Sequence, residues 1–225
     1  MSRQIDPPRD ESELMRRARD LAGQSVGQLA RRLGRALPAD PVRGKGIAGE
    51  LAERALGATA GNLDHPDFSA LGIELKTIPL DEAGHVREST FVCALDLDQV
   101  EREEWQDSRV RRKLGRVLWL PVQWKAGQPP AVRRYGIPLI WSPDPQEESL
   151  LRGDWLELVG RIAVGGIDEI TAHMGRALQI RPKAASASVQ VEAAGPEREP
   201  LLTVPRGFYL RSSFTERLLW RHSDG

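Results

Sequence analysis

The chain has 225 residues, of which 40% are hydrophobic and 28% charged, and its formal net charge at pH 7 is zero. This composition is typical of a folded globular protein and excludes a wholly disordered chain. The single cysteine, Cys93, excludes an intramolecular disulfide and a thiolate-rich zinc site. The zero net charge counts weakly against nucleic-acid binding, although binding needs only a local positive face.

The N-terminus lacks the apolar stretch of a signal peptide, and no apolar run is long enough to cross a bilayer. We therefore expect a soluble cytoplasmic protein without membrane contact. The length is sufficient for one domain or for two closely packed lobes.

The first part of the chain is predicted to be helical. Residues 1–10 are polar and contain prolines, which predicts a loose arm. Residues 11–36 keep apolar side chains at helical spacing on both sides of Gly23, which predicts helices. A further helix is predicted from about Ile47 to Leu56, ending at the following glycine. In that helix Glu53 projects off the apolar side, so it is not forced to be buried.

The rest of the chain mixes strand and helix patterns. Strands are predicted at residues 73–78, 88–97, 116–122, 137–141, 177–181 and 207–210. Helices are predicted from Pro143 to Val164, led by Ser142-Pro143, and from the capping box Ser213–Glu216 to about His222. Residues 184–200 are rich in Ala, Ser, Glu and Pro, so we expect a mobile loop. This mixture favours an α/β or α+β fold over a helical bundle or a β-sandwich.

Two details of the predicted strands concern particular side chains. Pro79 is expected to help end the strand at residues 73–78, because proline cannot donate to a neighbouring strand. In the strand at residues 88–97, Phe91, Cys93 and Leu95 are expected to share one face.

The segment from Asp67 to Lys76 combines two acidic side chains with a lysine. In a strand, side chains alternate between faces, so Glu74 and Lys76 share one face, about 7 Å apart along the strand. Gly72 is available for a turn between Asp67 and Glu74, so a hairpin or bend would bring the two carboxylates together. Close carboxylates repel each other, and the natural occupant of the gap is a hard divalent cation such as Mg²⁺.

The same spacing also occurs in an exposed strand with an alternating ion pair. Charged residues make up 28% of the chain, so acidic and basic side chains fall at this spacing by chance in many proteins. From the spacing alone, the metal site and the exposed ion pair both remain open.

Pro66-Asp67 and Glu74-Leu75-Lys76 resemble the Pro-Asp…(Asp/Glu)-x-Lys signature of the restriction-endonuclease-like superfamily. The chain is most similar to the MutH family, the strand-discrimination endonucleases of methyl-directed mismatch repair. This similarity continues in order through Asp67–Pro79, Thr90–Cys93, Val110–Leu114, Arg116–Pro121, Leu139–Pro143, Leu178–Ala184 and Pro205–Leu210. So many collinear matches are far more specific than the three charged residues alone.

This resemblance implies an architecture. A MutH-like chain would form a single endonuclease domain over residues 1–225, with a mixed β-sheet flanked by helices and two lobes around a DNA-binding cleft. The catalytic lobe would span roughly residues 11–105, and the recognition lobe roughly residues 106–225. We expect a monomer.

The resemblance also implies a chemistry. MutH-like enzymes use Mg²⁺, for which Mn²⁺ is expected to substitute, to nick the unmethylated strand of hemimethylated GATC sites 5′ to the G. Asp67, Glu74 and the Leu75 carbonyl would then be metal ligands, and Lys76 the catalytic lysine. Glu53 resembles the family's helical acidic residue, which completes the metal shell directly or through water. A plain surface position for this glutamate also remains open.

The expected contacts with double-stranded DNA follow from the same resemblance. Lys45, between two glycines, and Lys113 look like lysines close to the DNA backbone. The basic cluster around Lys113 is also compatible with a solvated helix face. Arg181-Pro182-Lys183 resembles the DNA-reading loop, and Lys183 is the expected base contact because arginine and lysine donate to guanine in the major groove.

Two aromatic side chains complete the expected DNA-binding set. Tyr209 resembles the tyrosine that senses adenine methylation, since a rigid aromatic wall distinguishes an added N6-methyl group by its volume. Phe91 lies near the DNA in the family. Packing within strands is the alternative for both side chains.

Three functions therefore stay open. The first is a nickase that MutL activates with ATP after MutS finds a mismatch; the partner would use the ATP, because this chain has no phosphate-binding glycine loop. The second is a restriction endonuclease that cuts both strands at GATC, usually as a dimer. The third is a catalytically silent DNA-binding module, which the presence of both carboxylates and the lysine disfavours.

Overall fold

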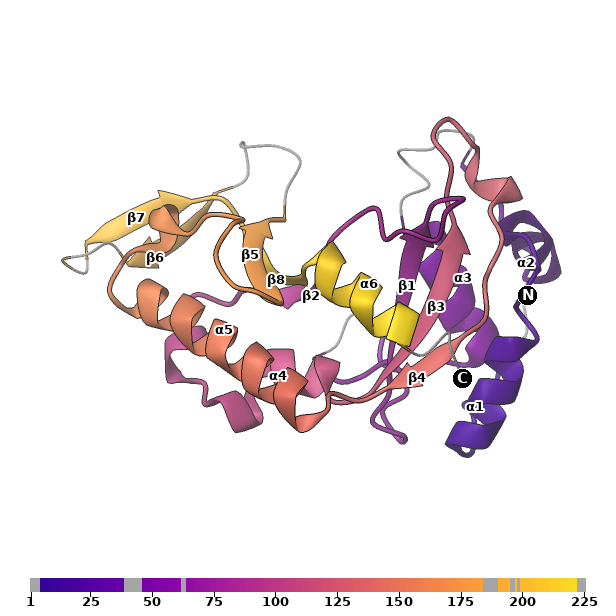
Figure 1. The fold of residues 1–225 in the computed structure, drawn as a ribbon, viewed down its shortest axis with the longest axis horizontal. Coiled ribbons are helices and arrows are strands. Elements are labelled where there is room, and N and C mark those ends of the chain that lie inside the picture. Colours follow the sequence, from indigo (N-terminus) through magenta and orange to yellow (C-terminus); the bar gives the residue numbers. More distant parts are fainter. Residues whose placement is uncertain are drawn as a thin grey trace. The chain divides into compact units, whose positions relative to one another are not determined.

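The computed structural model describes residues 5–38, 46–61, 64–183, 190–194, 197 and 199–221 (Figure 1). The chain divides into two compact units. Unit 1 takes in the residues up to Glu88 and Gly115–Ser142, and unit 2 takes in Ser89–Leu114 and Pro143–Arg221. The lobes that the sequence predicts are continuous segments, whereas these units are interleaved, because the chain returns to the sheet of unit 1 after the first segment of unit 2.

The described part of unit 1 contains helices and a mixed sheet (Figure 1). The helices are α1 (Glu11–Arg19), α2 (Val26–Arg32) and α3 (Ile47–Leu56), and the strands are β1 (Glu74–Leu80), β3 (Val117–Gln123) and β4 (Leu139–Trp141). A short 3-10 helix spans Pro130–Val132. The strand order is β1-β3-β4, with β1 parallel and β4 antiparallel to β3. Helices and a mixed sheet together confirm the predicted fold class.

The hydrophobic core of unit 1 joins the three helices to the sheet. It includes Leu14, Leu29, Leu51, Phe68, Leu75, Leu118 and Leu120, none of which is more than 5% exposed. Burial of these side chains is the main stabilising term for the unit. It also fixes α3 and β1, which carry the predicted catalytic residues Glu53 and Glu74.

Helix α3 lies at the predicted position and ends as predicted. Its C-terminal neighbour, Gly57, has a φ of 82°, in the left-handed region that glycine adopts without strain. A side chain at Gly57 would also collide with the carbonyl of Asp6. The glycine therefore both ends the helix and allows the N-terminal segment to approach it.

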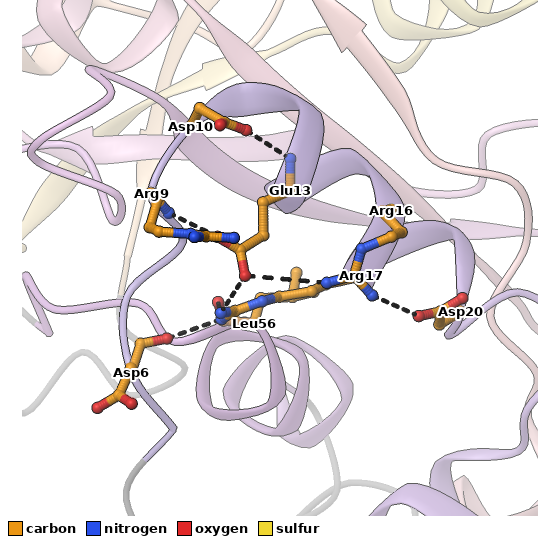
Figure 2. Close-up of polar contacts among 8 residues, drawn as sticks. All are labelled: Asp6, Arg9, Asp10, Glu13, Arg16, Arg17, Asp20 and Leu56. Carbon is orange, nitrogen blue, oxygen red and sulfur yellow. Dashed lines mark hydrogen bonds and ion pairs between the residues drawn. The ribbon is translucent and has the colours of Figure 1, made fainter.

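Arg17 of α1 holds the C-terminal end of α3 (Figure 2). Its Nη1 donates to the carbonyls of Asp6 at 2.7 Å and Leu56 at 3.1 Å, and its Nη2 donates to Glu13 at 2.9 Å. Glu13 also accepts from the backbone and the side chain of Arg9. These hydrogen bonds lower the pKa of Glu13 to about 2, and the bond from the Arg9 amide has the largest effect. The end of the segment predicted as a loose arm is thus tied to α3.

Unit 2 contains a second set of helices and strands. Its helices are α4 (Arg109–Leu114), α5 (Pro145–Ala163) and α6 (Ser212–Arg221), with 3-10 helices at Val100–Arg102, Trp105–Asp107 and Ile167–Glu169. An antiparallel sheet has the order β2-β8-β5, formed by β2 (Thr90–Ala94), β8 (Arg206–Leu210) and β5 (Leu178–Pro182). A hairpin pairs β6 (Val191–Ala194) with β7 (Pro200–Thr203). None of the helices that the structure describes is long and apolar enough to span a membrane.

The start of β5 is held by Asp154 of α5. This carboxylate is 4% exposed, and it accepts the N–H groups of Arg176, Ala177 and Leu178 at 2.9, 2.6 and 2.8 Å. Gly175, just before them, has a φ of 75°. A buried carboxylate with this many amide donors is well satisfied. The strand that carries Arg181 therefore begins at a firmly anchored turn.

Both predicted helix starts in unit 2 need correction. Helix α5 is capped by Asp144 with Pro145 in its first turn, and not by Ser142-Pro143, because the reciprocal hydrogen bonds of a capping box form between Asp144 and Glu147. Helix α6 begins at Ser212, so Ser213 lies within the helix and does not cap it.

Two predictions about strands also need correction. The loop expected over residues 184–200 is wrong where β6 and β7 pair, and residues 184–189, 195, 196 and 198 lie outside the described residues. Pro79 lies within β1 and does not end it. Because β1 is the edge strand of the sheet β1-β3-β4 and the Glu74 amide donates toward β3, strand alternation turns the Pro79 nitrogen away from β3, where the missing N–H costs little.

Candidate active site and recognition face

A tight turn places Asp67 beside the start of β1. Phe68 and Ile73 form an isolated antiparallel bridge, with N···O distances of 2.9 and 3.3 Å between their backbones. Gly72, in the turn, has a φ of 66°, which glycine adopts without strain. The predicted hairpin is confirmed, and it brings Asp67 opposite Glu74.

Hydrogen bonds then fix the two carboxylates. The Leu75 amide donates to Asp67 Oδ2 at 2.8 Å, and the Asp67 amide donates to Glu74 Oε2 at 3.3 Å. Lys76 Nζ donates to Glu74 Oε1 at 2.7 Å, so the two side chains share a face as predicted. The structure therefore gathers Asp67, Glu74 and Lys76 into one group.

This group is buried. Asp67 and Glu74 are 6% and 3% exposed, and the Lys76 side chain is 13% exposed. The alternative of an exposed strand with a surface ion pair is therefore wrong. Charged side chains are seldom buried unless they are paired or have a function, and buried titratable groups that interact are typical of active sites.

Glu53 of α3 interacts with the same carboxylates. Its pKa is raised to about 7, first by burial and then by the negative charges of Asp67 and Glu74, with the Lys76 charge acting in the opposite direction. Glu53 is half-buried, so it is not a fully exposed side chain, and its role beside Asp67 and Glu74 stays a prediction.

Backbone contacts connect α3 to the hairpin. The Ala58 amide donates to the Glu53 carbonyl at 2.9 Å, and the amides of Thr59 and Ala60 donate to the Asp67 carbonyl at 2.9 and 3.3 Å. The few residues after α3 thus bind both the helix and the segment that carries Asp67. Glu53 and Asp67 are held relative to each other by the main chain as well as by the core.

The donor set suits a hard divalent cation. Asp67, Glu74 and Glu53 offer carboxylate oxygens, which Mg²⁺ prefers, and Mg²⁺ needs only one or two of them because it keeps several waters. Among the described residues, no three His, Cys, Asp or Glu side chains converge into a ready-made metal cage. The metal roles of these residues and of the Leu75 carbonyl stay predictions.

A second group of predicted residues gathers on the sheet β2-β8-β5. Tyr209 pairs across strands with Phe91 on one side and with Gln179 on the other. The rings of Phe91 and Tyr209 meet edge to face, with centroids 5.3 Å apart. Lys183 Nζ lies 5.3 Å from the Phe91 ring centroid, a cation–π contact. We call Phe91, Gln179, Arg181, Lys183 and Tyr209 the recognition face.

Phe91 reaches the surface because of a β-bulge. The register of β2 against β8 shifts between Phe91 and Cys93, which are 36% and 5% exposed. The prediction that Phe91, Cys93 and Leu95 share a face is wrong, because the bulge interrupts the alternation. Gly207 makes room for the ring, since a Cβ there would lie 2.8 Å from Phe91 Cε2.

The remaining predicted DNA contacts differ in accessibility. Arg181, Pro182 and Lys183 are exposed, as side chains that read DNA must be. Lys113 of α4 is only 7% exposed, so a phosphate would reach it only after a rearrangement, and its role stays a prediction. Lys45 lies outside the described residues.

Sequence reasoning missed Gln179, which is part of the recognition face, and Ser89, which lies beside it. Gln179 Nε2 donates to Ser89 Oγ at 2.7 Å, and Arg181 Nη1 donates to the same oxygen at 3.1 Å. Gln179 stands two residues before Arg181, so strand alternation could have placed both on one face. Ser89 offers no such signal, because only the assembled sheet brings it to Gln179.

Comparison with known proteins decides the family. A family model described as "DNA mismatch repair enzyme MutH" matches residues 56–154. The DNA mismatch repair protein MutH of Serratia proteamaculans is 50% identical over 216 residues, which cover 96% of this chain and 95% of that protein. The corresponding protein of Vibrio parahaemolyticus is 50% identical over 215 residues, with 96% and 95% covered. The chain belongs to the MutH family of DNA mismatch repair endonucleases.

Membership of the MutH family confirms the predicted family, the restriction-endonuclease-like fold class and the prediction of an enzyme. The family model covers the segment with Asp67, Glu74 and Lys76, whereas Glu53 and strands β5 and β8 lie outside it. The similarity to the MutH relatives extends over 96% of the chain, and so includes most of both units.

Proposed function

We propose that this chain is a Mg²⁺-dependent endonuclease that nicks the unmethylated strand of hemimethylated GATC sites, 5′ to the G. The observation that carries the proposal is the buried group of Asp67, Glu74 and Lys76, in a chain that belongs to an endonuclease family. Catalytic carboxylates and a lysine in a dry, fixed arrangement suit hydrolysis of a charged phosphodiester.

The proposed reaction adds water across one phosphodiester. The attacking oxygen bonds to phosphorus, the P–O3′ bond breaks, and the leaving oxygen takes a proton, so the products are a 5′-phosphate and a 3′-hydroxyl. Mg²⁺, when bound, would acidify the water and neutralise charge on the phosphate. Asp67 and Glu74 would hold the ion with Glu53 and the Leu75 carbonyl. Lys76, fixed by Glu74, would stabilise the negative charge of the transition state.

The proposed sequence preference depends on the recognition face. Arg181 and Lys183 are exposed donors, which suit the O6 and N7 acceptors of guanine in the major groove. Tyr209, supported by the Phe91 ring at 5.3 Å, is a rigid aromatic wall of the kind that would exclude an N6-methyl group on adenine. We further propose that MutL activates the enzyme, indirectly after MutS finds a mismatch.

The proposal is tested by a nicking assay. Closed-circular plasmids with hemimethylated, unmethylated or fully methylated GATC sites are incubated with Mg²⁺, with and without MutL and ATP. We expect single-strand nicks on the unmethylated strand, greatly increased by MutL, with no cleavage of fully methylated sites and none in EDTA.

Two results would favour the other functions. Efficient double-strand breaks without MutL would indicate a restriction endonuclease. DNA binding without Mg²⁺-dependent cleavage, even with MutL present, would indicate a silent binding module. Mn²⁺ in place of Mg²⁺ is expected to support cleavage, because it shares the preference for oxygen ligands.

A further inference from the structure

The hydroxyl of Ser89 is a shared acceptor beside the recognition face. Gln179 donates to it at 2.7 Å and Arg181 at 3.1 Å. Gln179 is 4% exposed, whereas Arg181 is exposed, so the hydroxyl connects the interior of unit 2 to a charged side chain at its surface. A hydroxyl oxygen has two lone pairs, and these two donors occupy both.

The strand register orients this contact. Gln179 is paired directly with Tyr209, and Arg181 lies two positions further along β5. Residues two apart on a strand share a face, so Arg181 projects from the same face as Gln179 and Tyr209. Ser89 stands immediately before β2, at the other edge of the three-stranded sheet. The two hydrogen bonds therefore bridge the sheet from β5 to the start of β2.

We propose that Ser89 is a positioning residue that determines sequence specificity, because it holds the guanidinium of Arg181 in the orientation that meets a guanine edge. This inference rests on the proposed function, which assigns Arg181, in strand β5, a role as a donor to guanine. Ser89 itself acts through Arg181 and is not assigned a contact with the DNA.

The physical advantage is preorganisation. An exposed arginine samples many rotamers, and restricting them on binding costs entropy. A hydrogen bond that selects one orientation in the free protein reduces that cost. The guanidinium has five N–H donors, so one bond to Ser89 leaves others to meet acceptors in the DNA. The hydrogen bond from the buried Gln179 amide holds the Ser89 hydroxyl, the acceptor for Arg181, in place.

The test compares cleavage of two duplexes by the full-length protein, with Mg²⁺ and MutL. One duplex carries GATC, and the other carries the site with one base pair changed. The measured quantity is the ratio of kcat/KM for the two duplexes. We expect Ser89→Ala to reduce this ratio by about tenfold or more, the effect of losing one charge-assisted hydrogen bond. Ser89→Thr should keep the ratio, because it retains the hydroxyl.

A double-mutant cycle separates positioning through Arg181 from a general structural effect. In an Arg181→Ala background, Ser89→Ala should cause no further loss of the ratio. An equal loss in both backgrounds, or no loss in the wild-type background, would overturn the inference. If Arg181→Ala itself leaves the ratio unchanged, the reading role that the proposed function gives to Arg181 fails as well, whereas Mg²⁺-dependent nicking is judged separately.

Two further variants control for a nonspecific effect of substitution and for the loss of side-chain volume at Ser89. Ser213→Ala, an exposed serine of α6, is the matched control and should leave the ratio unchanged. Ser89→Cys has nearly the size of serine but a much weaker acceptor, so it should lower the ratio like Ser89→Ala without leaving a void. A normal ratio in a folded Ser89→Cys protein, checked by urea unfolding, would count against the inference.

Discussion

The candidate active site of unit 1 and the recognition face of unit 2 are built in opposite ways. The carboxylates of Asp67 and Glu74 are buried and linked to main-chain amides, so their positions are fixed by the backbone. On the recognition face the strands fix the main chain, but the side chains are open to solvent: Phe91 is 36% exposed, and Arg181 and Lys183 are exposed. There Lys183 contacts the Phe91 ring and Arg181 donates to the Ser89 hydroxyl.

This difference suits the role that the proposed function gives to each site. Stabilising the charge of a transition state requires dipoles and charges that are already in place in a medium of low polarity. Reading a base edge requires donors that the DNA can reach and that exchange water for base contacts on binding. The same chain therefore concentrates rigidity at one site and accessibility at the other.

The largest expected effect comes from the buried site. Glu74→Gln keeps the size of the side chain but removes its charge and its ion pair with Lys76. We expect the single-turnover cleavage rate to fall by about 100-fold or more, with DNA affinity in Ca²⁺ nearly unchanged. The control is Glu82→Gln, because Glu82 is an exposed acid paired with Lys125 in unit 1. Retention of more than about a tenth of the rate by Glu74→Gln would contradict the assignment.

On the recognition face the expected effect is smaller and concerns preference. Lys183→Ala removes the ammonium that lies over the Phe91 ring. We expect the kcat/KM preference for GATC over a site with one changed base pair to fall by about 10- to 100-fold. Lys125→Ala, at an exposed lysine of unit 1, should leave the preference unchanged. An unaltered preference in Lys183→Ala would remove this residue from the recognition face.

A variant at Arg17 tests how far the stability of unit 1 depends on the contacts at the C-terminal end of α3. Arg17→Met keeps the aliphatic chain but removes the hydrogen bonds to Asp6, Leu56 and Glu13. We expect the free energy of unfolding to fall by about 1–2 kcal/mol in urea titrations. Arg16→Met is the matched control on the same helix, since the Arg16 side chain is 64% exposed against 19% for Arg17. Equal stability changes in the two variants would show that α3 does not need this contact.

The smallest expected effect is on the pH dependence of stability in EDTA. Glu53 has a pKa of about 7 in the folded protein against 4.5 for the ordinary side chain, so the folded state binds more protons between these values. Stability from this group is therefore fully present below about pH 4.5 and is lost as pH rises through about 7. Glu53→Gln should remove that loss, about 1 kcal/mol after allowance for partial solvent screening. Urea unfolding near pH 5 and near pH 8 measures it, and identical pH slopes for both proteins would contradict the prediction.

The sequence by itself determined the local elements and the candidate catalytic group. Helical spacing and a following glycine placed α3, and the turn at Gly72 with strand alternation brought Asp67, Glu74 and Lys76 together. These predictions succeeded because they depend on backbone preferences and on contacts between residues close in the chain. Resemblance along the whole chain then identified the family, which spacing alone left open.

Only the tertiary structure decided burial and the long-range contacts. The bulge in β2 that exposes Phe91, the raised pKa of Glu53 and the hydroxyl that Gln179 and Arg181 share all depend on segments far apart in the chain. Such features follow from strand pairing and from the exclusion of water by neighbouring elements, and neither is encoded in the spacing of one short segment. Pro79 is a clear case, because its place inside β1 depends on an edge position in the sheet β1-β3-β4, where its nitrogen does not have to donate to β3.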